Sequence, residues 1–148
     1  MTRFRFVLGL MAVVGILIYA AVGDFDLDTP DADQQEKTAT ACLAAAGLHV
    51  KSDIPPYSRL GSPEYELDVD AEGDEHDHLA YVFLFDDSDA AETYFEREKS
   101  DAEDDPPPEG LKIEQRGPDV LRIFSDDPEA AKIRACVDKA AKPPPKKK

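Results

Sequence analysis

The segment of residues 66–78, ELDVDAEGDEHDH, concentrates carboxylates and histidines, the side chains that most often bind divalent metal ions. Carboxylate oxygens suit Ca²⁺, whereas imidazole nitrogens suit Zn²⁺ and Cu²⁺. The segment therefore predicts either a divalent-cation site, for Ca²⁺ or Zn²⁺, or a solvated hairpin loop that is acidic without binding an ion. The candidate ligands are Asp68, Asp70, Glu72, Asp74, His76 and His78.

The acids of this segment resemble the start of an EF-hand calcium loop. Asp68, Asp70 and Glu72, followed by Gly73, fall at the first, third, fifth and sixth positions of that pattern. The twelfth position, which holds a bidentate Glu in an EF-hand, is Leu79 here. The EF-hand assignment therefore fails, and a weaker calcium site of clustered carboxylates remains as the alternative.

The two histidines of the segment favour a different ion. Side chains two residues apart in a strand point to the same side, so His76 and His78 would face one way. With Asp74 or Glu72 nearby, they would form a site for Zn²⁺ or Cu²⁺. The sequence does not place His49 relative to this pair.

Patterns typical of catalysis are missing from the sequence. No serine lies in a GxSxG pattern, no cysteine has a CxxC partner, and there is no glycine-rich phosphate loop. Paired carboxylates carry no information in a chain with 32 acidic residues, because some pair is always close. We therefore expect a protein that is not an enzyme, with a hydrolase lacking any recognisable motif as an alternative.

Hydrophobic periodicity predicts an α+β fold with a small, mostly antiparallel sheet of four strands and three helices over one face. The expected order is helix, strand, strand, helix, strand, strand, helix. Residues 64–70 alternate apolar and acidic side chains, and residues 78–85 are apolar on both faces, as in a central strand. The expected helices cover residues 33–47, 88–99 and 127–141, and two further strands surround a turn at residues 117–119.

The two cysteines lie on the apolar stripes of the first and last expected helices. We expect Asp33 to cap the first helix, which carries Cys42, and Asp127 to cap the last, which carries Cys136. A disulfide between them would close nearly the whole domain. Two free buried thiols are the alternative.

The N-terminus predicts the compartment. Arg3 and Arg5 precede eighteen uncharged residues, 6–23, which as a helix would span about 27 Å, close to the hydrocarbon thickness of a bilayer. We expect a single-pass anchor with a cytoplasmic N-terminus and an extracytoplasmic domain; the alternative is a signal peptide cleaved near Gly23, giving a secreted protein. The expected membrane-facing residues include Phe6, Leu10, Val14, Leu17 and Val22.

Charge divides the chain into four parts and limits its partners. The net charge is −15. All acidic residues lie within residues 24–138, and the charged residues outside this range are all Lys or Arg. The expected parts are the anchor or signal peptide at 1–23, an acidic linker at 24–33, one α+β domain at 34–141 and a disordered Pro/Lys tail at 142–148. So acidic a domain repels nucleic acid.

The sequence as a whole predicts a binding or structural module of the bacterial cell envelope, with an envelope protein or an anionic polymer as partner. The sequence does not indicate an oligomeric state.

Overall fold

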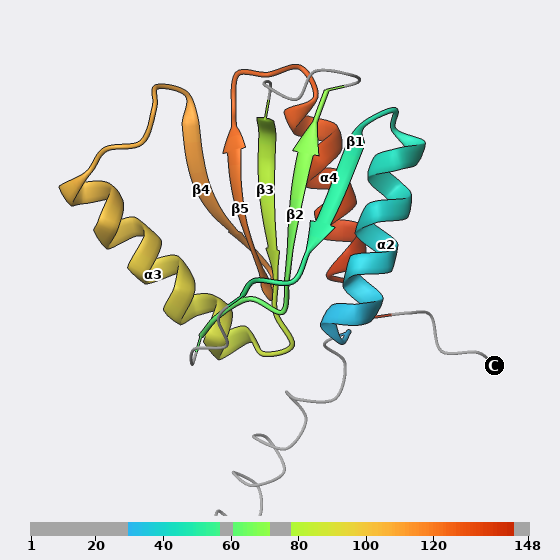
Figure 1. The fold of residues 1–148 in the computed structure, drawn as a ribbon, viewed down its shortest axis with the longest axis horizontal. Coiled ribbons are helices and arrows are strands. Elements are labelled where there is room, and N and C mark those ends of the chain that lie inside the picture. Colours follow the sequence, from blue (N-terminus) through green and yellow to red (C-terminus); the bar gives the residue numbers. More distant parts are fainter. Residues whose placement is uncertain (1–29, 57–60, 72–77, 144–148) are drawn as a thin grey trace, which may run out of the picture.

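The computed structural model describes residues 30–56, 61–71 and 78–143, which form one antiparallel sheet and three helices (Figure 1). The predicted α+β class is therefore correct. The strand order across the sheet is β1-β2-β3-β5-β4. In chain order the elements are α2 (Ala32–Ala45), β1 (His49–Asp53), β2 (Tyr65–Asp70), β3 (His78–Leu84), α3 (Ser88–Asp104), β4 (Leu111–Arg116), β5 (Asp119–Phe124) and α4 (Ala130–Ala140).

The sheet has five strands, so the prediction of four was wrong. The missed strand is β1, which pairs with β2 at one edge of the sheet. Its sequence, HVKSD, shows no hydrophobic alternation, because only Val50 packs against the core while its neighbours are exposed. An edge strand of this kind is held by backbone hydrogen bonds to its neighbour, which periodicity does not reveal.

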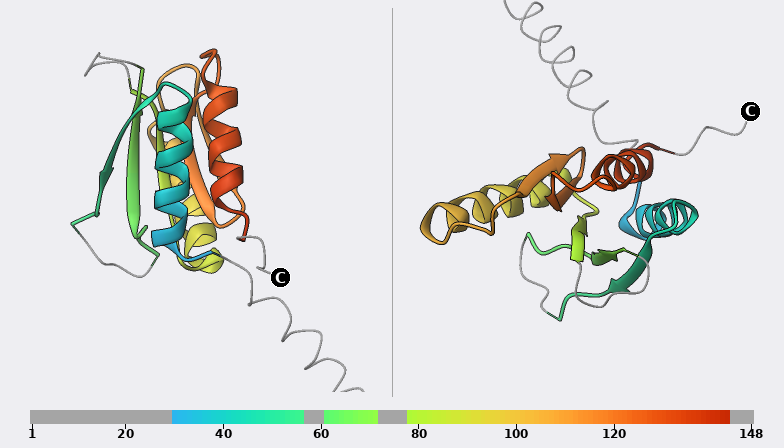
Figure 2. Two further views of the ribbon diagram at one scale, coloured as in Figure 1. Left: turned by 90° about the vertical axis from the view of Figure 1, so that its right-hand side faces the viewer. Right: turned by 90° about the horizontal axis from the view of Figure 1, so that it is seen from above.

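The helices cover both faces of the sheet, which corrects the prediction that they lie over one. Alternate residues of β3 divide the core: Ala80, Val82 and Leu84 pack with α2 and α4, whereas Phe83 packs with α3. The first layer is the larger and is continuous from α2 through β2, β3 and β5 to α4. Figure 2 shows α2 and α4 side by side, with α3 lying apart from them. On the second face of the sheet, α3 lies mainly against β4 and β5, so it leaves β1 and β2 largely uncovered on that face.

Two of the expected helix caps lie elsewhere. α2 begins at Ala32 because Asp31, not Asp33, accepts the hydrogen bond from the backbone N–H of Gln34 at 2.7 Å. The Asp127 carboxylate accepts from the N–H of Glu129 at 2.7 Å, in a turn before α4, which begins at Ala130. The cap of α3 is Asp87, whose side chain accepts from the N–H of Asp89.

Cys42 and Cys136 form a disulfide with a Cα–Cα distance of 5.5 Å, as their helix stripes predict. The bridge joins α2 to α4 across 94 residues of chain. Cys136 is buried in the larger core layer and Cys42 packs against that layer. The disulfide therefore ties together the two helices that close one face of the sheet.

The expected membrane segment at 1–23 lies outside the described residues, as does most of the tail at 142–148. Within residues 30–56, 61–71 and 78–143, no helix has the length and apolar character needed to cross a bilayer. α2 begins and α4 ends at the same end of the sheet, and β2 ends and β3 begins at the opposite end (Figure 1).

Candidate metal centre on the open sheet face

Polar side chains of β1, β2 and β3 gather on the side of the sheet that faces away from α2 and α4. On β2, Leu67 and Val69 are buried in the larger core layer. The residues that alternate with them, Glu66, Asp68 and Asp70, therefore point to the other side of the sheet. We call this surface the open sheet face. Its residues are His49, Lys51, Asp53, Glu66, Asp68, Asp70, His78 and Tyr81.

Three of the expected ligands meet on the open sheet face. His78 Nδ1 lies 2.9 Å from Asp68 Oδ1 and 3.1 Å from Asp70 Oδ1. One ligand atom from each of the three side chains falls within 4.8 Å of the other two. The side chains of Asp68 and Asp70 are 23% and 14% exposed, so the carboxylates are partly withdrawn from water while the imidazole is more accessible.

A β-bulge brings His78 to this face. The register shifts between Val69, which pairs with Ala80, and Asp70, which pairs with His78. Simple alternation along β3 would send His78 to the same side as Ala80, into the larger core layer. The extra residue, Leu79, is 7% exposed and packs in that layer, while His78 turns to the carboxylates. Bulges commonly re-aim a side chain in this way.

The carboxylates create a strongly negative environment. The hydrogen bond to Asp68 raises the pKa of His78, partly opposed by desolvation and supported by the charges of Asp68 and Asp70. Desolvation raises the pKa of Tyr81, and the charge of Asp68 raises it further. The Tyr81 ring also stacks on His78, with centroids 5.5 Å apart. The two carboxylates thus favour the protonated form of the His78 imidazole.

The buried oxygen of Asp70 has His78 as its partner. Asp70 Oδ1 is buried, and among the described residues it lies 3.1 Å from His78 Nδ1. Buried carboxylate oxygens normally accept hydrogen bonds or bind a cation. A metal ion held between His78 and Asp70 would supply this oxygen with a positively charged partner.

A cavity of about 660 Å³ adjoins the cluster. His78 lines it together with apolar Leu79 and Phe124 and acidic Asp126 and Asp127. His78 is therefore shared between the carboxylate cluster and a hollow large enough for water or a small ligand.

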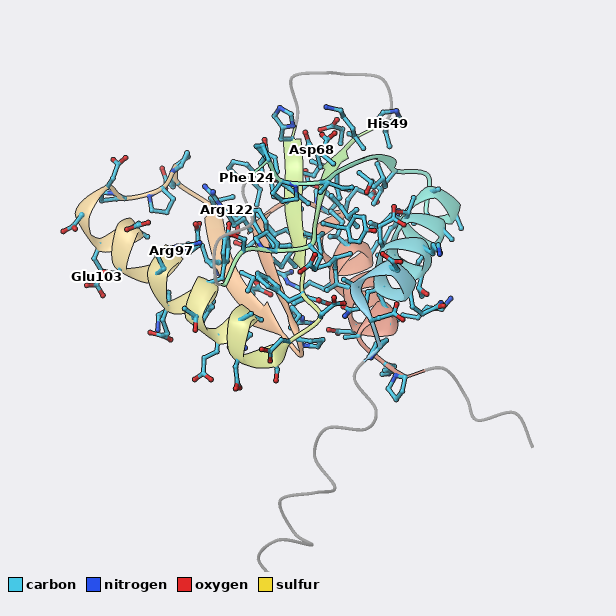
Figure 3. The ribbon with its side chains drawn as sticks, turned by 60° about the horizontal axis from the view of Figure 1, so that its bottom comes forward. His49, Asp68, Arg97, Glu103, Arg122 and Phe124 are labelled. Atoms are coloured by element: carbon cyan, nitrogen blue, oxygen red, sulfur yellow. A yellow bond between two sulfur atoms is a disulfide. The ribbon has the colours of Figure 1, made fainter. Side chains whose placement is uncertain are left out.

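The structure assembles only part of the expected ligand set. Asp68, Asp70 and His78 come together, whereas Glu72, Asp74 and His76 lie outside the described residues. His49 joins the same end of the open sheet face, on the strand that sequence periodicity missed. Figure 3 shows His49 and Asp68 at this end. The only sequence signal for His49 was its residue type.

No protein-family model matches the chain, and neither a curated protein nor a solved structure matches it. Function therefore has to be inferred from the chemistry of the cluster and from the charge pattern of the sequence.

Proposed function

We propose that this protein is an extracytoplasmic domain that binds a divalent metal ion through Asp68, Asp70 and His78. The observation that carries the proposal is the convergence of two carboxylates and an imidazole, from two neighbouring strands, within 4.8 Å. Ligands around a tetrahedral Zn²⁺ ion lie about 3.4 Å apart, given bond lengths of about 2.1 Å. Because His78 is already 2.9 and 3.1 Å from the two carboxylates, small side-chain rotations would suffice to enclose an ion.

The disulfide supports a location outside the cytoplasm. Disulfides persist mainly in oxidising compartments, and the Cys42–Cys136 bridge spans most of the domain. The described chain begins just before α2, at the end of the sheet opposite to the end at which β2 finishes and β3 begins (Figure 1).

The other candidate functions have weaker support. The described residues expose one large hydrophobic side chain, Ile54, rather than an apolar patch that would dock an envelope protein. The acidic open sheet face would repel an anionic polymer. A hydrolase would need a nucleophile beside a base, and no described serine or cysteine lines the cavity next to His78.

We expect Zn²⁺ to raise the thermal unfolding midpoint of the full chain in detergent, relative to EDTA at matched ionic strength. An ion at a hundredfold excess over its dissociation constant stabilises the folded state by about 2.7 kcal/mol, or roughly 8 °C for a domain of this size. Asp70→Asn and His78→Ala should each remove most of this increase. Calorimetry or circular dichroism would measure the midpoint.

Asp53→Asn is the matched control, because Asp53 is an exposed carboxylate on the same face that pairs with Lys51 at 2.9 Å rather than with the cluster. It should retain the full response to Zn²⁺. Equal midpoints in Zn²⁺ and EDTA for the wild type would contradict the proposed function.

A further inference from the structure

His49 lies in one row with Asp70 and His78 across three strands. The register of β1 and β2 places His49 opposite Asp70, and the register of β2 and β3 places His78 opposite Asp70 on the other side. Val50 packs against the larger core layer, so its neighbour His49 points to the open sheet face. Lys51, two residues along β1, lies on the same face, since it is opposite Asp68 in the register and forms an ion pair with Asp53 at 2.9 Å.

The spacing of the row suits a metal ion held between the two imidazoles. The backbones of β1 and β3 are separated by two strand spacings, or about 9.6 Å. That distance is within the combined reach of two imidazole side chains and two coordination bonds of about 2.1 Å. Asp70 lies on the strand between them, and its buried Oδ1 is already 3.1 Å from His78 Nδ1. Among the described residues, the ligand atoms within 4.8 Å of one another do not include those of His49, so binding requires the exposed His49 ring to rotate toward Asp70.

We propose that His49 is the fourth protein ligand of the metal site and that it makes the site selective for Zn²⁺-like transition ions over Ca²⁺ and Mg²⁺. This inference rests on the proposed function and specifies its ion class. Two imidazoles and two carboxylates form a four-coordinate site of mixed nitrogen and oxygen ligands, which Zn²⁺ and Co²⁺ accept. Ca²⁺ requires six to eight oxygens, and Mg²⁺ an octahedron of oxygens that includes water.

A four-ligand site has a structural consequence for β1. The ion would join β1, β2 and β3, whereas among the described strands β1 now pairs only with β2, at the edge of the sheet. Backbone amides of β1 should therefore exchange with solvent more slowly when Zn²⁺ is bound. Without His49 as a ligand, the ion would leave exchange in β1 nearly unchanged.

The test compares the wild type, His49→Ala, His78→Ala and His76→Ala as full chains in detergent, titrated with Zn²⁺, Co²⁺ and Ca²⁺. We expect His49→Ala to weaken Zn²⁺ binding by at least roughly tenfold, to lose the visible absorption of tetrahedral Co²⁺ and to leave Ca²⁺ binding unchanged. His76→Ala tests the remaining candidate histidine and should retain Zn²⁺ binding if His49 is the fourth ligand, and Asp53→Asn, on the same face and paired with Lys51, is the control. Because His49 is exposed, the unfolding midpoint of ion-free His49→Ala should match that of the wild type.

The possible failures separate the two proposals. Wild-type Zn²⁺ affinity in His49→Ala, with loss in His78→Ala, would overturn the role of His49 and retain the three-residue site. Loss in His76→Ala with none in His49→Ala would assign the fourth position to His76 and also overturn the inference. A wild type that binds Ca²⁺ but neither Zn²⁺ nor Co²⁺ would overturn the inferred ion class alone, and one that binds none of the three ions would overturn the proposed function itself.

Discussion

Reduction of the Cys42–Cys136 disulfide is expected to lower the free energy of unfolding by about 4.5 kcal/mol, from the chain-entropy cost of a loop of 94 residues. Domains of this size are typically stable by only about 5–15 kcal/mol, so the bridge accounts for a large share of the total. The physical reason lies mainly in the unfolded chain, which loses conformational freedom when its distant ends are joined. Denaturant titration of the full chain, with and without a reductant, would measure the difference.

A double variant, Cys42→Ala with Cys136→Ala, provides the control for this prediction. It should have nearly the stability of the reduced wild type and should not respond to the reductant. Some additional loss is expected because Cys136 is buried, and its truncation leaves a small cavity. A reduced wild type within about 1 kcal/mol of the oxidised protein would show that the helices, rather than the bridge, hold this face of the sheet together.

Asp119→Asn is expected to remove the loss of stability that ionisation of Asp119 causes between acidic and neutral pH. Asp119 is completely buried at the start of β5, and burial raises the pKa of its carboxyl from 3.8 to about 8. The folded state therefore keeps the proton while the unfolded chain releases it, so the contribution of Asp119 to stability is fully present below pH 4 and is lost as pH rises toward 8. The slope is up to about 1.4 kcal/mol per pH unit.

Asparagine cannot ionise, so the variant avoids this penalty. The free energy of unfolding of the variant minus that of the wild type should therefore be about 4 kcal/mol larger at pH 7 than at pH 4. Urea titrations at several pH values would measure this difference. Asp126→Asn, which removes an exposed carboxylate in the loop after β5, should keep the wild-type slope. Parallel pH profiles for Asp119→Asn and the wild type would contradict the assignment of the buried proton to Asp119.

Part of the candidate site was readable from the sequence. Clustered carboxylates and histidines identified Asp68, Asp70 and His78 as candidate ligands, because these residue types are common ligands of divalent metal ions. The expected partner of His78 was His76, through strand alternation. The structure instead pairs His78 with carboxylates of the adjacent strand through a bulge at Asp70. A bulge depends on contacts between strands, and alternation within one strand cannot predict it.

His49 shows the same limit at longer range. It is separated from Asp70 by more than twenty residues, yet the pairing of β1 with β2 places the two opposite each other. β1 buries little more than Val50, so its hydrophobic pattern was too weak to indicate a strand. Only the complete sheet reveals that His49 shares a row with the candidate ligands.

The sequence by itself determined the properties that depend on local patterns: the charge asymmetry, the apolar N-terminal run, three helices, four of the five strands and a cysteine on each of two apolar helix stripes. These follow from side-chain periodicity and residue type, which act within a few turns of chain. The tertiary structure decided the features that require two distant segments to meet: the edge strand β1, the placement of α3 opposite α2 and α4, the buried carboxyl of Asp119 and the convergence of Asp68, Asp70 and His78. Strand register and burial are set by packing between elements, so they appear only when the whole sheet is assembled.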